Sequence, residues 1–283
     1  SEKVGLLKVD FLGLATLTLI HYAAQNIRNR HGVDFIPGDL DLEDAPTYEM
    51  LGRGEAKGIF QFESEGMRQL LRDARPNCLE DLIALNAMYR PGPMENIPSF
   101  VARKHGREEI VYLHPMLEPI LSNTYGIIVY QEQVIRIANV VGGFSLPDGD
   151  SLRKAMGKKD QDLMDKFEGQ FVDGAVGNGF SREQAIALWD QLKQFAEYGF
   201  NKSHAAAYAF LAFQTAWLKA HYPREFMAAL LTIEIGAQSK VSEYIQECQQ
   251  MGIDVLPPDV NESGAAFTPL DEGIRFGLEA IKG

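Results

Sequence analysis

Apolar residues recur at helical spacing through most of the chain. Between residues 12 and 30, Leu14, Leu17, Ile20, Ala24 and Ile27 fall on one face. The same three- and four-residue spacing predicts further helices over 47–51, 65–74, 79–89, 117–122, 131–141, 181–197, 223–235 and 240–250. Strand patterns are short, at 3–11 and 274–278, while 58–64 fits a strand or a turn and 125–130 a strand or a helix entry. The pattern therefore predicts a mainly α fold with a short N-terminal strand and a small α+β piece at the C-terminus.

The longest predicted helix follows a polar cluster formed by Asn201, Lys202, Ser203 and His204. Ser203 is a good N-cap and Pro223 is a stop signal, which together predict a helix of about five turns. The free amides and the dipole at a helix start favour negative charge. The cluster is therefore either an ordinary capped helix start or a site for an anion.

A second polar segment, residues 148–160, is strongly basic. Asp150 or Ser151 can cap a helix in which Lys154 and Lys158 lie on one side and Arg153 on another. Like charges at this spacing are mildly unfavourable in an isolated helix. The segment is therefore either a solvated basic face or a surface that meets an anion. Another basic run lies at 99–107.

Composition limits the classes of protein. The 283 residues carry a formal net charge of -12, which argues against a general nucleic-acid coat but leaves room for one local basic track. Two cysteines exclude a disulfide framework, and no apolar run is long enough to cross a bilayer, so we expect a cytoplasmic location and no membrane partner. The first residues lack both an initiator methionine and a signal-peptide pattern, which is typical of an excised segment.

Asp10 is the best catalytic candidate by position, because it is the charge within an apolar strand pattern. A carboxylate placed there needs a cation or an ion pair, and Lys8, two residues away on the same face, can supply the pair. The histidines show no metal-ligand spacing, and no phosphate-binding P-loop or hydrolase elbow occurs. The residues alone fit a phosphate-handling enzyme segment and a helical binding module equally well.

Several long motifs resemble, in order, those of the bacterial replicative DNA polymerase III alpha subunit, the C-family polymerase. They are KVDFLGLATLT at 8–18, GIFQFES at 58–64, YRPGP at 89–93, RKHGREE at 103–109, YGIIVYQEQV at 125–134, LRKAMGKK at 152–159, YGFNKSHAAAYA at 198–209, WLKAHYP at 217–223 and LPPD at 256–259. The resemblance covers nearly the whole chain. It implies a segment of that polymerase: residues 1–20 as the end of the palm, 21–236 as a multi-helix fingers domain, and 237–283 as the end of the fingers leading into a helix-hairpin-helix and clamp-binding region.

The resemblance also implies roles for individual residues. Asp10 corresponds to the third of three catalytic carboxylates that hold Mg²⁺, with Lys8 beside it near a phosphate. The expected contacts with nucleotide are Arg153, Lys154, Lys158, Lys159, Asn201, Lys202, Ser203 and His204, and those with DNA are Arg90, Arg103, Lys104 and Arg107. His204 is expected near the sugar, where it helps to reject ribonucleotides. Lys154 departs from the second arginine common in the family, which removes a bidentate grip.

The expected partners follow from the same resemblance. They are template-primer DNA, a dNTP, the rest of the polymerase with its palm D-x-D strand, thumb and N-terminal domain, and a sliding clamp and other replisome subunits bound through regions outside this chain. The expected activity is DNA-directed DNA polymerisation as part of a larger assembly, with this segment inactive by itself. The alternative is a non-catalytic helical module of the same family that binds DNA or a replisome partner.

Overall fold

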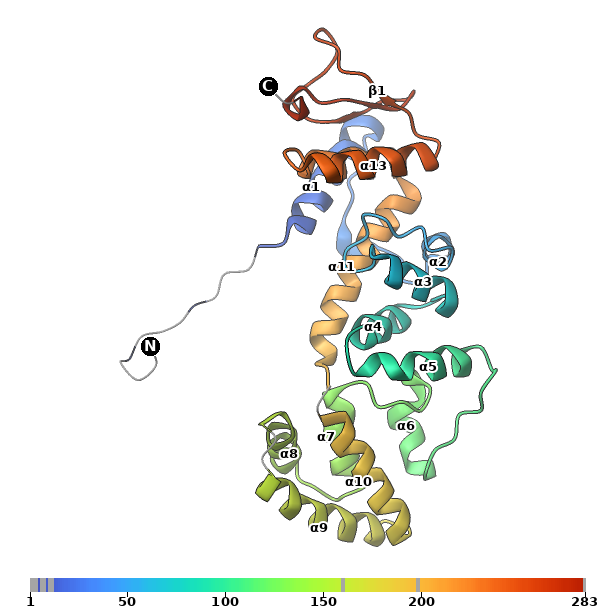
Figure 1. The fold of residues 1–283 in the computed structure, drawn as a ribbon, viewed down its shortest axis with the longest axis vertical. Helices are drawn as coiled ribbons and strands as arrows, with labels where there is room; N and C mark the ends of the chain where they lie inside the picture. The colour runs from blue at the N-terminus through green and yellow to red at the C-terminus, as the bar shows by residue number, and fades with distance from the viewer. Residues whose placement is uncertain (1–4, 6–8, 10–12, 159–160, 197–198, 282–283) are drawn as a thin grey trace. The chain divides into compact units, whose positions relative to one another are not determined.

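The computed structural model describes residues 5, 9, 13–158, 161–196 and 199–281, without the side chains of 156–158, 161, 162 and 196. The predicted N-terminal strand at 3–11, with Lys8 and Asp10, lies outside this description, as does Lys159. The described part is mainly α with a small sheet near the C-terminus, which confirms the predicted fold class (Figure 1). No described helix is long and apolar enough to cross a membrane.

The elements follow one another as a series of α-helices before the sheet. The helices are α1 (Ala15–His31), α2 (Ala45–Gly52), α3 (Glu65–Ala74), α4 (Leu79–Met88), α5 (Ile97–Lys104), α6 (Glu118–Leu121), α7 (Gln131–Val140), α8 (Leu146–Lys158), α9 (Gln161–Gly177), α10 (Arg182–Ala196), α11 (Lys202–His221), α12 (Pro223–Ile233) and α13 (Gln238–Gln250). The strands are β1 (Val255–Leu256), β2 (Thr268–Pro269) and β3 (Ile274–Arg275). Short 3-10 turns link several of them.

The chain divides into two compact units. The first draws on residues 1–50, 55–64 and 211–283, and the second on 51–54 and 65–210, so the division falls within α11. These units are discontinuous in sequence, because α1 packs with α12 instead of with its neighbours along the chain. The boundaries at 20 and 236 that the resemblance implies concern parts of a polymerase, and they stay a prediction.

In the first unit, α1 packs its apolar face against α12. Leu19, Ile20, Ala23 and Ile27 are buried on α1, as the helical spacing predicts. Helix α12 buries nearly its whole middle, and α13 and the sheet cover it further. The strand order is β1-β3-β2, with β3 parallel to β1 and antiparallel to β2. The C-terminal piece is therefore part of the same packed unit as α1.

In the second unit, one continuous apolar core joins α6 to α10. Trp189, Phe171 and Phe144 are its large, fully buried side chains. A Cβ on Gly174 of α9 would lie 2.0 Å from the carbonyl oxygen of Gly142, just after α7, so the two backbones touch there. This close approach helps to hold α9 against the end of α7. Leu152 and Ala155 anchor the inner face of α8 in the core.

Two helix starts differ from those predicted. Helix α8 begins at Leu146, where the Ser145 hydroxyl accepts the Asp148 amide at 3.3 Å, so Asp150 and Ser151 are interior residues. Ser145 and Asp148 have the spacing of a capping box, which wins over the later candidates. Helix α11 begins at Lys202, and the Asn201 side chain, not Ser203, accepts the His204 amide at 2.8 Å. Its length of 20 residues agrees with the predicted five turns.

Of the two ambiguous segments, one forms turns and the other an entry to a helix. Residues 58–64 form successive turns, with Gln61 at a positive φ of 64°. Residues 125–130 form an irregular entry to α7 that begins with Tyr125 in the left-handed region and ends in a parallel bridge between Tyr130 and Phe200. That bridge ties the start of α7 to the segment just before α11.

Candidate functional site

The basic helix α8 presents Arg153 and Lys154 beside one carboxylate. Asp150 accepts from Arg153 Nε at 3.0 Å and forms an ion pair with Lys154 Nζ at 2.7 Å. The hydrogen bonds from Lys154 and then from Arg153 hold the pKa of Asp150 below its usual value. The Lys154 side chain is 61% exposed, so its charge faces solvent while the opposite side of α8 is packed. The Lys158 side chain and Lys159 lie outside the description.

The start of α11 already holds a carboxylate. Glu132, near the start of α7, accepts the Lys202 backbone amide at 2.9 Å and the Asn201 side-chain amide at 3.0 Å. The Lys202 ammonium pairs with Glu80 at 3.0 Å and lies over the Tyr130 ring. The groups predicted to attract an anion thus bind carboxylates of the protein itself, and a helix start favours such negative charge. What remains open at this place are the exposed side chains of Ser203 and His204.

A row of neighbouring side chains passes from Arg90 through Phe200 to the first two turns of α11. The Arg90 guanidinium lies 4.4 Å from the centre of the Phe200 ring. The Phe200 and His204 rings meet edge to face, with 5.4 Å between their centres, and the centres of the His204 and Tyr208 rings lie 4.2 Å apart. We call these four residues the aromatic row. The sequence analysis singled out Arg90 and His204 but missed Phe200 and Tyr208. The spacing of four residues between His204 and Tyr208 is the signal of a shared helix face, whereas Phe200 precedes α11 and no helical spacing indicates it.

Burial shapes the chemistry around this row. Burial lowers the pKa of Arg90, and the pKa of an arginine lies so high that the guanidinium stays charged. The Tyr130 hydroxyl is buried and has no hydrogen-bond partner within the described ranges. Burial, with the nearby carboxylates of Glu80, Asp81 and Glu132, raises the pKa of Tyr130 well above its usual range. Tyr130 is therefore neutral and serves as the wall under Lys202.

Tertiary contacts give the basic residues of the run at 99–107 different roles. Lys104 pairs with Asp81 at 2.7 Å, and both side chains are almost fully buried, at 6% and 4% exposed. Arg103 donates to Glu108 at 2.7 Å and to the Tyr125 carbonyl at 3.1 Å. Arg107 alone of the three predicted DNA contacts here is exposed and lines a hollow between α3 and α5. Lys104 in particular serves as a structural cation.

The predicted nucleotide contacts form two clusters. No hydrogen bond or ion pair joins Arg153 or Lys154 to Asn201–His204 among the described side chains, although both clusters belong to the second unit. The described residues also contain no group of three or more His, Cys, Asp or Glu side chains placed to hold a metal ion. The one expected magnesium ligand in this chain, Asp10, lies outside the description, so no described residue set fits Mg²⁺.

The comparison with protein families gives a definite class. Residues 16–179, more than half of the chain, match the bacterial DNA polymerase III alpha subunit finger domain. Residues 252–283, which contain the small sheet, match the helix-hairpin-helix motif. The matched range contains helices α1 to α9, with the basic helix α8 among them, and this part of the chain is thus a finger domain.

Individual relatives agree along the whole chain. DNA polymerase III subunit alpha of Chlamydia muridarum is 52% identical over 282 residues, covering 100% of this chain and 23% of that protein. The Borreliella burgdorferi protein of the same name is 53% identical, covering 99% and 24%, and that of Thermus aquaticus is 52% identical, covering 99% and 23%. The chain belongs to the bacterial DNA polymerase III alpha subunit family, and it spans about a quarter of the length of these relatives. The resemblance that the motifs indicated is confirmed.

Proposed function

We propose that this chain is the segment of a replicative DNA-directed DNA polymerase that binds the incoming dNTP and the template-primer. The observation that carries the proposal is the identity of about half of all residues with DNA polymerase III alpha subunits over essentially the entire chain. Such a segment works within the bacterial cytoplasm as part of a larger polypeptide or complex, and we expect it to be inactive by itself.

In this proposal the basic helix α8 binds the triphosphate. Arg153, Lys154, Lys158 and Lys159 neutralise phosphate charge by preorganised electrostatics, a role that needs no proton transfer. The support from the fold is that the apolar face of α8 is fixed in the core while Lys154 faces solvent. Asp150 holds Arg153 and Lys154 near each other and competes with a phosphate for them.

The start of α11 binds the nucleoside part. Because Glu132 takes the Lys202 amide, a phosphate meets the Lys202 ammonium and the Ser203 hydroxyl here, and not the helix amides. His204, exposed in the aromatic row, then lies near the sugar and contributes to the rejection of ribonucleotides. Arg90, Arg103 and Arg107 bind the DNA backbone; the burial of Lys104 with Asp81 argues against a direct contact from Lys104.

The chemical step belongs to the palm. Asp10 supplies one Mg²⁺ ligand, with Lys8 beside it, and two further carboxylates come from the D-x-D strand of the palm on another part of the polymerase. The described residues offer no metal-binding group, so we assign no reaction step to the ion within this chain. The thumb, the N-terminal domain, the sliding clamp and other replisome subunits are the remaining proposed partners.

Nucleotide incorporation on a primed template tests this function. The chain is assayed in Mg²⁺ alone and mixed with a separately expressed segment that carries the palm D-x-D strand. We expect incorporation only in the mixture, lost with Asp10→Ala and kept with Asp39→Ala, which removes an exposed carboxylate at the end of a short 3-10 turn before α2. If neither sample incorporates nucleotide while the chain alone binds DNA, the alternative of a non-catalytic binding module holds.

A further inference from the structure

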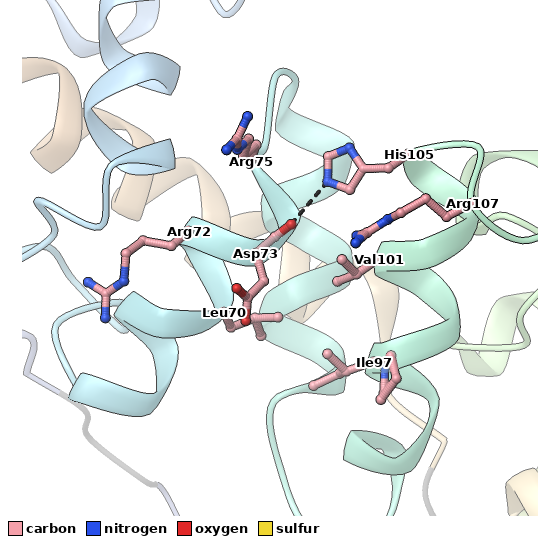
Figure 2. Close-up of a pocket in the computed structure, with 9 residues that line it drawn as sticks. Leu70, Arg72, Asp73, Arg75, Ile97, Val101, His105 and Arg107 are labelled. Carbon is pink, nitrogen blue, oxygen red and sulfur yellow. Dashed lines mark hydrogen bonds between the residues drawn. The ribbon is translucent and has the colours of Figure 1, made fainter.

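A hollow of about 620 Å³ lies in the second unit where the end of α3 meets α5. Its lining combines two kinds of residue. Leu70, Ile97, Pro98 and Val101 form an apolar floor, and Arg72, Asp73, Arg75, His105 and Arg107 form the rim. Figure 2 shows the Arg75, His105 and Arg107 side chains around one side of the opening, while Arg72 points away from them. We call this hollow the α3–α5 pocket.

The positive charge at the rim is not neutralised within the protein. The guanidinium groups of Arg75 and Arg107 make no ion pair or hydrogen bond within the part of the chain that the structure describes, and both residues are exposed. Asp73 is the single acidic residue of the lining, and its carboxylate accepts from Gln69 Nε2 at 2.9 Å. In a chain of net charge -12, two unpaired arginines at one hollow are a local exception.

Two helix ends explain how cations are held here without carboxylate partners. Arg75 directly follows α3 and its amide donates to the Leu71 carbonyl at 2.9 Å, while His105 and Gly106 end α5. His105 Nε2 lies 3.0 Å from the Asp73 carbonyl oxygen, which ties the two helix ends together. The carboxyl end of a helix favours positive charge. Three side chains able to donate hydrogen bonds therefore stand around one opening.

The backbone of Arg75 is unusual for its residue type. Its φ is 44°, in the left-handed region where helices commonly end on glycine. A non-glycine residue there costs about 1 kcal/mol, yet the position carries an arginine that is exposed at the rim. The Arg75 and His105 side chains lie on the same side of the hollow (Figure 2).

We propose that the α3–α5 pocket binds a phosphodiester group of single-stranded DNA, with the adjoining sugar or base on the apolar floor. The two non-bridging oxygens of a phosphodiester can accept hydrogen bonds from the two planar guanidinium forks at once. The floor of Ile97, Pro98 and Val101 suits the apolar faces of a nucleoside. The inference rests on the proposed function, since that function makes an unpaired template strand the anion available to this chain.

Binding of a fluorescent single-stranded oligothymidine without terminal phosphates tests the site, with fluorescence anisotropy as the readout. We expect Arg75→Ala/Arg107→Ala to weaken binding about tenfold or more. It should also reduce the slope of log affinity against log salt by about 0.7, because the two arginines share one phosphate and each phosphate neutralised on a single strand contributes about 0.7. The matched control is Arg136→Ala/Arg182→Ala, two exposed arginines of the same unit, which should change affinity less than twofold. Circular dichroism establishes that each variant is folded.

A second readout places the contact. The nuclear magnetic resonance signal of the His105 imidazole, assigned with His105→Gln, should shift on adding the oligonucleotide to the unmodified chain and stay unchanged in the arginine double variant. Equal loss of affinity in the control pair, or a His105 signal that does not move, would overturn the proposal. If thymidine monophosphate competes as strongly as the oligonucleotide, the ligand of the pocket is a free nucleotide. If polyglutamate does so, the ligand is an acidic peptide. Either result also overturns the proposal.

The two proposals fail separately. If the α3–α5 pocket binds no strand, incorporation in the mixture with the palm segment still supports the polymerase function. If incorporation never occurs, the loss of strand binding in the arginine double variant still establishes the pocket as a DNA contact of a binding module.

Discussion

Glu132 on α7 and Lys202 on α11 are joined by a hydrogen bond in which the Glu132 carboxylate accepts the Lys202 backbone amide at 2.9 Å. The same carboxylate accepts from Asn201, which itself caps the helix by accepting the His204 amide. One side chain 70 residues away thus fixes where the longest helix of the chain begins. The bond links the core around α7 to the proposed nucleotide site.

Replacing Glu132 should therefore destabilise the chain. We expect Glu132→Ala to lower the free energy of unfolding by about 1 to 2 kcal/mol, the usual effect of losing a helix cap that carries a charge. Glu132→Gln keeps an acceptor and should recover about half of that loss. Urea unfolding followed by circular dichroism measures both. Glu109→Ala, an exposed carboxylate of the same unit, is the control, and an equal loss in that variant would contradict the assignment.

Lys104 should affect stability more than DNA binding. Lys104→Met leaves the Asp81 carboxylate buried without its cation, so we expect a loss of about 3 to 5 kcal/mol in the free energy of unfolding. Lys104→Met/Asp81→Asn removes both charges while keeping an acceptor for the Asn77 amide, and it should be more stable than Lys104→Met alone. Thermal and urea unfolding of the unmodified chain and of both variants measure these differences in stability.

The DNA affinity of the same variants separates structure from recognition. For the double variant at a temperature where it is fully folded, we expect binding of single-stranded DNA within about twofold of the unmodified chain, because the Lys104 side chain is only 6% exposed. A large loss of affinity in a folded Lys104→Met/Asp81→Asn variant would show that Lys104 contacts DNA directly.

The outcome at Lys104 shows what the sequence could predict and what it could not. Helical spacing identified α1, α11 and most other described helices, because periodic apolar residues depend on local geometry alone. Arg103, Lys104 and Arg107 look alike in the sequence, but contacts with Asp81, Glu108 and Tyr125 give them different roles. Those partners lie up to 23 residues away, and no local pattern announces them.

Helix starts and the site show the same limit. Ser145, Asp150 and Ser151 are all good caps within seven residues, and the hydrogen bonds between Ser145 and Asp148 place the start of α8 at the first of them. The basic character of α8 and the polar start of α11 were visible in the sequence. Two other features depend on segments far apart in the chain. One is the Glu132 carboxylate that accepts from the start of α11, and the other is the position of Arg75 and Arg107 at the same hollow.

Glu63 should make stability depend on pH. Burial alone would raise the pKa of Glu63, but hydrogen bonds from Lys240 and Tyr244, together with the Lys240 charge, lower it below its ordinary value of 4.5. A carboxyl whose pKa is lower in the folded state stabilises the fold above the unfolded pKa, and this contribution is lost as pH falls through the folded pKa. The side chain is 35% exposed, so we expect about 1 kcal/mol at pH 7.

The difference between the unmodified chain and Glu63→Gln measures this contribution. Urea unfolding at a series of pH values should give a higher free energy of unfolding for the unmodified chain than for Glu63→Gln at pH 7. This difference should narrow below about pH 4.5 and vanish below the pKa of Glu63 in the folded state. Glu49→Gln, an exposed carboxylate of the same unit, should show no such change. A difference that is constant from pH 7 to pH 3 would mean that the charge of Glu63 is not what stabilises the contact.

Asp150 should limit how tightly the basic helix binds phosphate. Its carboxylate pairs with both Arg153 and Lys154, so a triphosphate must compete with it for the same two cations. We expect Asp150→Asn to tighten dNTP binding by about two- to fivefold, a modest change because the pairs lie at the surface and are screened by water and salt. Isothermal titration calorimetry at low and high salt measures the effect, which should shrink as salt rises.

The control for that measurement is Asp173→Asn, which removes an exposed carboxylate paired with Arg182 on a neighbouring part of the same unit. It lowers the overall negative charge equally, so a general reduction of repulsion would improve binding in both variants. A gain confined to Asp150→Asn assigns the triphosphate to Arg153 and Lys154. Weaker binding in Asp150→Asn would instead mean that the carboxylate acts chiefly to hold the two cations in position, and that their placement on α8 matters more than the competition.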